Sequence, residues 1–286
     1  MTGVVGWAAE LTESVIADVA GTLLGPSVFG QLREMSAASY SLVDGAAVKT
    51  IAHSSVASGG FVSEGEPIQV GALLIGPVNL PAKKAALIVA ITNEVLRGSA
   101  ANVQNSLQQL LAEDLALAID AVLLDAVAAD AIRHAGLRFG VAGLTPAASG
   151  TPSEKTAADI KALVGAIMPS SRPVLIAAGA QAASLSVLTA GLPLIAAPTL
   201  AVGTIIAVDA NSFVSVIGAI DLAASGEPVI HMSDAPLPIS TVGSPATIAA
   251  PTSSMFQTDA TSLRCIQYIN WAMRCSVVDG GRRLVI

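Results

Sequence analysis

A long stretch without helix breakers constrains this fold most, because no glycine or proline interrupts Val103 to Ile132. Apolar residues recur there at three- and four-residue spacing, the spacing of one helix face. They are Val103, Leu107, Leu110, Leu111, Leu115, Ala118, Ile119 and Val122. Asn102 fits the N-cap, because its side-chain oxygen can accept from a free N–H of the first turn. The pattern predicts a helix from Ser99–Asn102 to about Ala129, roughly 40 Å long at 1.5 Å per residue.

A strand and a helical turn are predicted just before this helix. Lys83 and Lys84 end an extended arm, and the branched apolar run from Ala85 to Thr92 is short enough for a strand. Asn93 to Leu96 suits a helical turn, which Gly98 breaks. The long helix therefore follows a strand closely and serves as a spine for an elongated structure.

The segment from Val56 to Leu80 predicts a long two-stranded hairpin. It contains five glycines and two prolines and lacks lysine and arginine. Turn residues place its tip near Ser63 to Pro67. The expected strand pieces are Phe61–Val62, Ile68–Val70 and Leu73–Ile75. Because an isolated hairpin is marginally stable in water, we expect this segment to be ordered only against a partner.

The first 25 residues predict an amphipathic helix with two open packing partners. Its apolar residues recur every four positions with acids between them, and Gly25-Pro26 ends it. They are Trp7, Leu11, Val15, Val19 and Leu23. This face packs either on its own domain or on a neighbouring copy of the chain. Beyond it we expect a helical turn at 29–35, a strand at 40–43 and an extended segment from Lys49.

The second half predicts a small α/β domain and a long final strand. Residues 136–153 are rich in glycine, proline and serine and mark a domain boundary. Thr151 or Ser153 can cap the next helix, Glu154 to Met168. Further expected elements are strands at 173–178, 194–196, 204–208, 214–217 and 220–221, a helix at 180–189, and extended or loop structure at 228–254. Met255 to Cys275 alternates with a period of two, which is typical of a strand.

Composition excludes several classes of protein. Apolar residues make up 53% of the chain, which excludes disorder, and only 12% are charged, so we expect neighbouring subunits to cover much of the surface. The net charge of −7 without a basic stripe argues against tight nucleic-acid binding. The chain lacks a clean apolar run of about 18 residues and a basic signal region. We therefore expect no membrane contact and a chain that is made and kept in the cytoplasm.

No catalytic pattern accompanies these elements. His53, His134 and His231 stand in no metal-ligand spacing, and no nucleophile or phosphate-loop motif occurs. Glu64 and Glu66 form a carboxylate pair, but a hairpin tip suits a solvated or partner-facing role. We expect no enzyme activity, no cofactor and no metal.

The order of these parts resembles the major capsid protein of tailed bacteriophages, with its Hong Kong 97-like fold. After the glycine-rich loop come AKKAALIVAITNEVL and the long helix, then PVLIAAGAQAASLSVL and LPLIAAPTLAVGTIIAVDA, and last MFQTDATSLRCIQYINWAMR. The resemblance covers roughly residues 40–278 and implies an α+β fold. Its parts would be a peripheral domain with a spine helix and a β-sheet, an extended β-hairpin loop and an inserted α/β axial domain.

The resemblance also implies a domain order. The expected segments are an N-terminal arm (1–35), a first peripheral part (36–55), an extended loop (56–82), the peripheral domain with the spine helix (83–150), the axial domain (151–251), and a return strand with the C-terminal tail (252–286). The loop would lie over the adjacent subunit, and the axial domain would pack around the centres of hexamers and pentamers.

The resemblance implies a shell protein of an icosahedral head that encloses double-stranded DNA, found in the virion after assembly in the host cytoplasm. Its main partner would be itself, with a scaffold, protease, portal or decoration protein as further partners and non-specific proximity to packaged DNA. The residues expected at subunit interfaces are Phe61, Glu64, Glu66, Ile68, Lys83, Lys84, Arg97 and Trp7.

Two departures and two alternatives accompany this expectation. Residues 50–82 contain no lysine, which argues against the lysine–asparagine cross-link of some family members. Because residues 1–35 alone precede the core, we expect either a processed form or a separate scaffold. An encapsulin-like nanocompartment shell with an enzyme cargo is one alternative, and a small α/β enzyme is the other.

Overall fold

The computed structural model describes residues 27–42, 48–53, 60–68, 75–98, 101–168, 170–189, 191–231, 252–274 and 284–285. The helix predicted over residues 1–25, with Trp7, lies outside them. The described residues belong to two compact units, one with parts of 86–115 and 220–267, the other with parts of 23–85, 116–219 and 268–286. None of the described helices combines the length and the apolar character that a membrane span needs. The domain order expected from the sequence stays a prediction.

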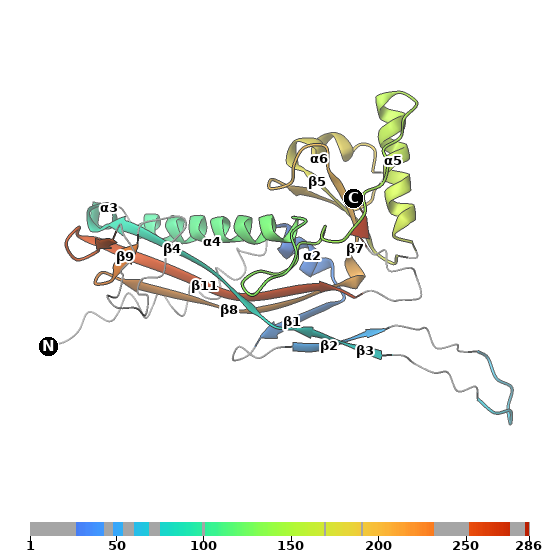
Figure 1. Ribbon diagram of the computed structural model, residues 1–286, viewed down its shortest axis with the longest axis horizontal. Helices are drawn as coiled ribbons and strands as arrows, with labels where there is room; N and C mark the ends of the chain where they lie inside the picture. The colour runs from blue at the N-terminus through green and yellow to red at the C-terminus, as the bar shows by residue number, and fades with distance from the viewer. Residues whose placement is uncertain are drawn as a thin grey trace, which may run out of the picture. The chain divides into compact units, whose positions relative to one another are not determined.

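Two long strands, β8 and β11, are neighbours in a four-stranded sheet of order β1-β8-β11-β4 (Figure 1). β1 runs parallel to β8, with Ala38 opposite Val214. The bounds are Ala38–Leu42 for β1, Lys83–Thr92 for β4, Phe213–Ser225 for β8 and Ala260–Met273 for β11. The strand predicted at Ala85–Thr92 and the strand predicted at 40–43 are therefore confirmed.

Strand β8 is one element where the sequence predicted two. The prediction broke the strand at Gly218, but the strand continues through this glycine. A Cβ atom at Gly218 would lie 3.2 Å from the Cβ of Tyr268 on the neighbouring strand β11. The glycine therefore permits close approach of two backbones within the sheet, which is one of the ordinary uses of glycine in a strand.

Strand β11 confirms the predicted alternation but begins later than expected. Cys265, Gln267, Ile269 and Trp271 are all buried, as one face of the predicted strand requires. Residues 255–259 form a turn before the strand, closed by the Ala260 N–H, which donates to the Met255 carbonyl at 3.0 Å. Asp259, the last residue of this turn, has a φ of 43°, a left-handed conformation that a strand residue does not adopt.

The predicted spine helix exists as α4 but ends earlier than expected. It spans Ala101–Leu123, after the short helix α3, Asn93–Gly98, so Asn102 lies in its first turn and not at the N-cap. The predicted end near Ala129 is wrong, because hydrogen bonds outside the helix compete with its continuation. The Leu123 carbonyl accepts from the Leu137 N–H at 2.7 Å, and the Asp125 side chain accepts from the Val127 N–H at 3.0 Å, so both groups favour a turn.

The predicted hairpin has a paired base formed by strands β2 and β3. β2, Val48–His53, is antiparallel to β3, Ile75–Leu80, with Val48 opposite Leu80 and His53 opposite Ile75. Residues 60–68, which we call the loop tip, form no strand, so the strand pieces expected at Phe61–Val62 and at Ile68 are wrong. The expected turn does lie there: Gly65 has a φ of 87°, and the Glu66 N–H donates to the Ser63 carbonyl at 3.2 Å.

A second four-stranded sheet, of order β12-β7-β5-β6, forms the predicted α/β part. β5 is parallel to β6 and antiparallel to β7. Helix α5 contacts β7, and helix α6 contacts β5 and β6. The bounds are Pro152–Ala166 for α5, Pro173–Ala178 for β5, Gly179–Leu185 for α6, Leu194–Ala197 for β6, Ile205–Asp209 for β7 and Leu284–Val285 for β12. Thr151, one of the two expected caps, forms a complete capping box with Glu154.

An aromatic cluster joins helix α2, Val28–Met35, to the ends of β8 and β11. The ring of Phe29 lies 6.1 Å from the ring of Phe213 and 6.1 Å from that of Trp271. All three side chains are buried, so these ring contacts lie in the interior. A short antiparallel pair, β9 (Val229–His231) and β10 (Thr252–Ser254), completes the described strands.

Candidate functional site

The loop tip carries the most exposed large apolar side chain among the described residues, that of Phe61. Every residue from 60 to 68 is exposed, and the side chains of Phe61 and Ile68 reach relative exposures of 111% and 80%. Glu64 and Glu66 lie exposed between them. A large aromatic ring without cover from its own chain is unfavourable in water. The tip therefore combines apolar anchors with negative charge, as a protein-binding segment does.

The other residues expected at interfaces divide into three groups. Lys84 is exposed on β4. Lys83, one position earlier, is half-buried, and its Nζ donates to the backbone carbonyls of Asp130 and Arg133, the latter at 2.5 Å. Trp7 and the side chain of Arg97 lie outside what the structure describes. Lys83 therefore has a role within its own chain that the sequence did not suggest.

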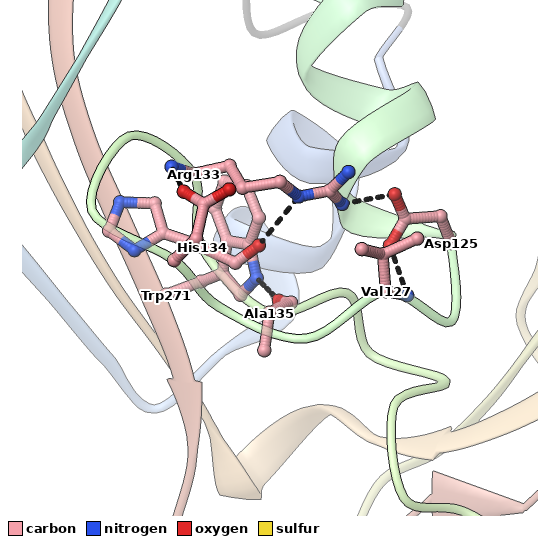
Figure 2. Close-up of polar contacts among 7 residues, drawn as sticks. Asp125, Val127, Arg133, His134, Ala135 and Trp271 are labelled. Carbon is pink, nitrogen blue, oxygen red and sulfur yellow. Dashed lines mark hydrogen bonds and ion pairs between the residues drawn. The ribbon is translucent and has the colours of Figure 1, made fainter.

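Residues 124–144, which we call the clamped loop, contain no helix or strand. Asp125 and Arg133 form an ion pair across this loop, and the Arg133 Nε–H donates to the His134 carbonyl at 3.4 Å (Figure 2). Asp130 Oδ1 accepts from the backbone N–H groups of Ile132 and Arg133 at 2.6 and 2.7 Å. These contacts lower the pKa of Asp130. Such a long segment without secondary structure is uncommon and usually functional.

Strand β11 holds the clamped loop from its other side. The indole N–H of Trp271 donates to the Ala135 carbonyl at 3.0 Å (Figure 2). His134 Nε2 lies 2.8 Å from the Ile269 carbonyl, and its ring packs edge-on against Trp271 at 5.0 Å. Burial lowers the pKa of His134 and nearby Lys83 lowers it further, while the bond to Ile269 acts in the opposite direction. The neutral ring therefore fits this position.

Gly136 is required by the path of the clamped loop. A Cβ atom at this position would lie 2.1 Å from the backbone oxygen of Asp125, closer than any side chain can approach. The Gly136 N–H also donates to the Val127 carbonyl at 3.1 Å. Gly136 therefore packs backbone to backbone against residues 125–127 at the start of the loop.

Asp120 is a buried carboxylate that the sequence analysis missed. It lies on α4 with 1% relative exposure, and its two oxygens accept from the Val28 and Phe29 N–H groups of α2 at 2.8 and 2.9 Å. Burial raises its pKa to about 6, although both hydrogen bonds lower it. In the sequence, the position of Asp120 between Ile119 and Leu123, on the apolar face of the predicted helix, could have indicated that it is buried. Asp120 therefore joins helix α4 to helix α2.

An open cavity of about 460 Å³ lies between the clamped loop, Lys83 and the end of β11. Apolar surface predominates in its walls, which include Leu137, Phe139 and Trp271. The part of the chain that the structure describes contains no group of three side chains able to hold a metal ion. The candidate site is therefore a pair of surfaces, the exposed loop tip and the cavity beside the clamped loop.

Comparisons with known structures show the same fold. A chain of Mycobacterium phage Cain is similar with a TM-score of 0.61 at 10% identity, over 89% of this chain and 88% of that one. A chain of Microbacterium phage Oxtober96 has a TM-score of 0.59 at 12% identity, over 86% and 87%. A chain described as the capsid of an empty GTA particle has a TM-score of 0.52 at 11% identity, over 85% and 86%. No curated protein sequence matches.

The sequence itself matches a family model. Residues 25–198 match the model described as the phage capsid family. This range includes the hairpin, the spine helix α4 and strands β5 and β6 of the second sheet. The mixed α/β architecture agrees with the phage structures to which the chain is similar. Because more than half of its residues match that model, this chain belongs to the phage capsid family.

Proposed function

We propose that this chain is the major capsid protein of a tailed bacteriophage, with a Hong Kong 97-like fold. It assembles with copies of itself into hexamers and pentamers of an icosahedral head that encloses double-stranded DNA. It acts in the virion after assembly in the host cytoplasm. Membership of the phage capsid family supports a shell protein, and the likeness to phage chains supports the fold.

The exposure of the loop tip carries this proposal. Phe61 and Ile68 are uncovered, and the tip has no apolar core of its own. Burying an aromatic ring at an interface contributes about 1.5–3 kcal/mol relative to leaving it in water. A shell of many copies offers each tip a partner surface. The proposed interface residues are Phe61, Glu64, Glu66, Ile68, Lys83, Lys84, Arg97 and Trp7.

Segment roles follow from this function. Residues 56–82 act as the extended loop over an adjacent subunit, and 83–150 form the peripheral domain with the spine helix. Residues 151–251 act as the axial domain around the centre of each hexamer or pentamer. The extensive apolar core around β5 supports a rigid axial domain. Copies that join head to tail in this way close into rings when the rotation permits.

Analysis of purified particles tests the proposed function. The chain is expressed alone and together with a candidate scaffold, and negative-stain images and nuclease-protected nucleic acid are recorded. Icosahedral shells, or free hexamers and pentamers, are expected, and particles isolated from phage-infected cells should protect double-stranded DNA. Particles that hold an enzyme and no DNA would instead indicate a nanocompartment. A chain that forms no higher assembly under any of these conditions would contradict the proposal.

A further inference from the structure

We propose that Lys83 and Asn270 are positioning residues that fix the direction in which the hairpin of β2 and β3 leaves the rest of the chain. The inference rests on the proposed function, because a fixed direction makes all copies meet alike in a shell. It concerns residues 80–83, which lead from β3 into β4 and which we call the hairpin root. The test below measures single copies, so a failure of this positioning is distinct from a failure to form shells.

Beyond the root, the hairpin has no further strand beside it among the described residues. β2 and β3 form a two-stranded sheet of their own. Their pairing runs from Val48 opposite Leu80 to His53 opposite Ile75. An isolated two-stranded ribbon is marginally stable and twists more than a wider sheet does. The direction of this ribbon is therefore set where it joins the larger structure, at the root.

The first three root residues are held against the sheet of β1, β8, β11 and β4. Leu80 is 2% exposed and packs in a buried cluster with apolar residues of β1 and β8. Ala82 packs against the same cluster. Between them, the ring of Pro81 restricts the backbone to a φ near about −65°. Packing thus fixes the position of the root, while hydrogen bonds are needed to fix its direction.

Two side chains supply these hydrogen bonds. Asn270, on β11 and 3% exposed, donates its amide N–H to the Pro81 carbonyl at 2.5 Å. The Asn270 side-chain oxygen accepts from the Trp271 N–H at 2.6 Å, so one acceptor and one donor define the orientation of the amide. Lys83 Nζ donates from the root to two backbone carbonyls of the clamped loop. Its positive charge makes these bonds stronger than neutral ones.

The clamped loop gives Lys83 acceptors in a fixed place. An ion pair lies across this loop, and the Trp271 indole N–H donates to the Ala135 carbonyl at 3.0 Å (Figure 2). Lys83 is therefore tied to a loop that is itself tied to β11. Asn270 lies on the same strand. Both sets of hydrogen bonds at the root consequently lead to β11, from two sides.

A small rotation at the root has a large effect at the far end of the hairpin. Strands β2 and β3 have six residues each, which corresponds to about 20 Å at 3.3 Å per residue. A rotation of about 10° at the root then moves the far end of the ladder by roughly 3 Å. Whether head-to-tail copies close into one kind of ring depends on such angles. Loss of either side chain should therefore make the shells less uniform.

A distance measurement between two spin labels tests the positioning role. Cys275→Ser is introduced first, and Cys265 is buried, so neither native thiol competes for the label. The labels are attached to His53→Cys, at the far end of the ladder, and to Ser39→Cys, an exposed position on β1. Full-length unassembled subunits are selected by size-exclusion chromatography with light scattering. Pulsed electron paramagnetic resonance then gives the width of the distance distribution.

Lys83→Met removes the N–H donors at nearly unchanged side-chain length and should broaden the distribution about twofold. Asn270→Leu should broaden it similarly, whereas Lys83→Arg, which keeps donors for both carbonyls, should restore the original width. Lys161→Met, which removes an exposed charge on α5, and Thr151→Ala, which weakens the cap of α5, are controls and should leave the width unchanged. An unchanged width in Lys83→Met and Asn270→Leu, or equal broadening in Thr151→Ala, would overturn the proposal.

Particle size gives a second readout that a general loss of stability would not move. Electron micrographs of assembled particles should show a wider range of diameters for Lys83→Met than for the original chain or Lys161→Met. Uniform diameters in Lys83→Met despite a broadened distance distribution would overturn the link between hairpin direction and shell geometry. If the original chain forms no particles while the label distances behave as expected, the proposed function fails and the positioning role of Lys83 and Asn270 stands.

Discussion

The second sheet and the loop tip differ in how far they bury their apolar side chains. Strand β5 has apolar residues on both faces, and Val174, Leu175, Ile176, Ala177 and Ala178 are all at most 2% exposed. Helix α6 contacts it, and apolar residues of α5 share a buried cluster with Leu175 and Ala177, within the same chain. The loop tip also carries apolar residues, but no described part of the chain covers Phe61 or Ile68. The second sheet buries its apolar side chains within a single copy, whereas the loop tip leaves Phe61 and Ile68 exposed.

This contrast separates stability from assembly. Substitutions in the covered region should lower the free energy of unfolding of a single copy, since they leave cavities or unpaired groups. Substitutions in the tip should leave that free energy nearly unchanged and act on assembly. The following predictions run from the largest expected effect on unfolding to the smallest.

Leu175→Ala should have the largest effect on folding. Leu175 is 1% exposed in β5 and packs in the cluster with Ile160, Leu163 and Ile167. Removing the buried side chain should lower the free energy of unfolding by about 2–5 kcal/mol. Urea denaturation of unassembled subunits measures the effect. Val187→Ala, at an exposed position of the same region, is the control and should change it by less than about 0.5 kcal/mol. Equal effects would contradict the assignment of this core.

Asp120→Asn should change how stability depends on pH. Burial raises the pKa of Asp120 from 3.8 to about 6 in the folded chain. The stability linked to its protonation is therefore present below about pH 4 and is lost as the pH rises through 6. Between pH 4 and 7, the free energy of unfolding of the original chain should fall by about 3 kcal/mol relative to Asp120→Asn.

Urea denaturation at several pH values checks this difference. Glu113→Gln provides a matched control, because Glu113 is an exposed acid on the same helix. Its pH profile should follow that of the original chain. A difference between Asp120→Asn and the original chain that stays constant from pH 4 to 7 would show that Asp120 does not titrate in this range.

Thr151→Ala should have a smaller effect, of about 1 kcal/mol. Thr151 Oγ1 accepts from the Glu154 N–H at the start of α5, and Glu154 accepts from the Thr151 N–H at 2.8 Å. The sequence left Ser153 as the alternative cap, so Ser153→Ala is the natural control and should change stability by less than half as much. Thermal unfolding followed by circular dichroism compares the two. The reverse order would contradict the observed cap.

Phe61→Ala should have the smallest effect on unfolding, below about 0.5 kcal/mol, because the ring is already in water in a single copy. The same substitution should reduce the yield of assembled particles at least tenfold. Ser63→Ala is the control at the tip and should leave both quantities unchanged. A large loss of stability in Phe61→Ala would show that the ring packs within its own chain.

Elements set by local pattern could be predicted from the sequence. The strand at Ala85–Thr92, the helical turn after it and the strand at Pro173–Ala178 follow from apolar periodicity and breakers, and all exist. Thr151 could be named as a cap because its hydrogen bonds are local. The exposed tip with Glu64 and Glu66 could be placed because glycine and proline mark the turn.

Features set by distant contacts could not be predicted. Helix α4 ends at Leu123 because Leu137 and Asp125 provide competing hydrogen bonds, and no breaker residue marks that point. Gly218 looks like a strand end in the sequence but serves the approach of β11 to β8. The cavity depends on Lys83 and Trp271, which are almost two hundred residues apart in the chain. Their meeting follows only from the tertiary fold.

The most direct test of the central claim compares the full chain with a chain lacking residues 58–70, by size-exclusion chromatography with light scattering. The account predicts large particles, or discrete hexamers and pentamers, for the full chain. It predicts a folded monomer for the shortened chain, with a radius of gyration of about 19 Å and unchanged resistance to urea. Normal particles from the shortened chain would contradict the claim that the loop tip joins one copy to the next.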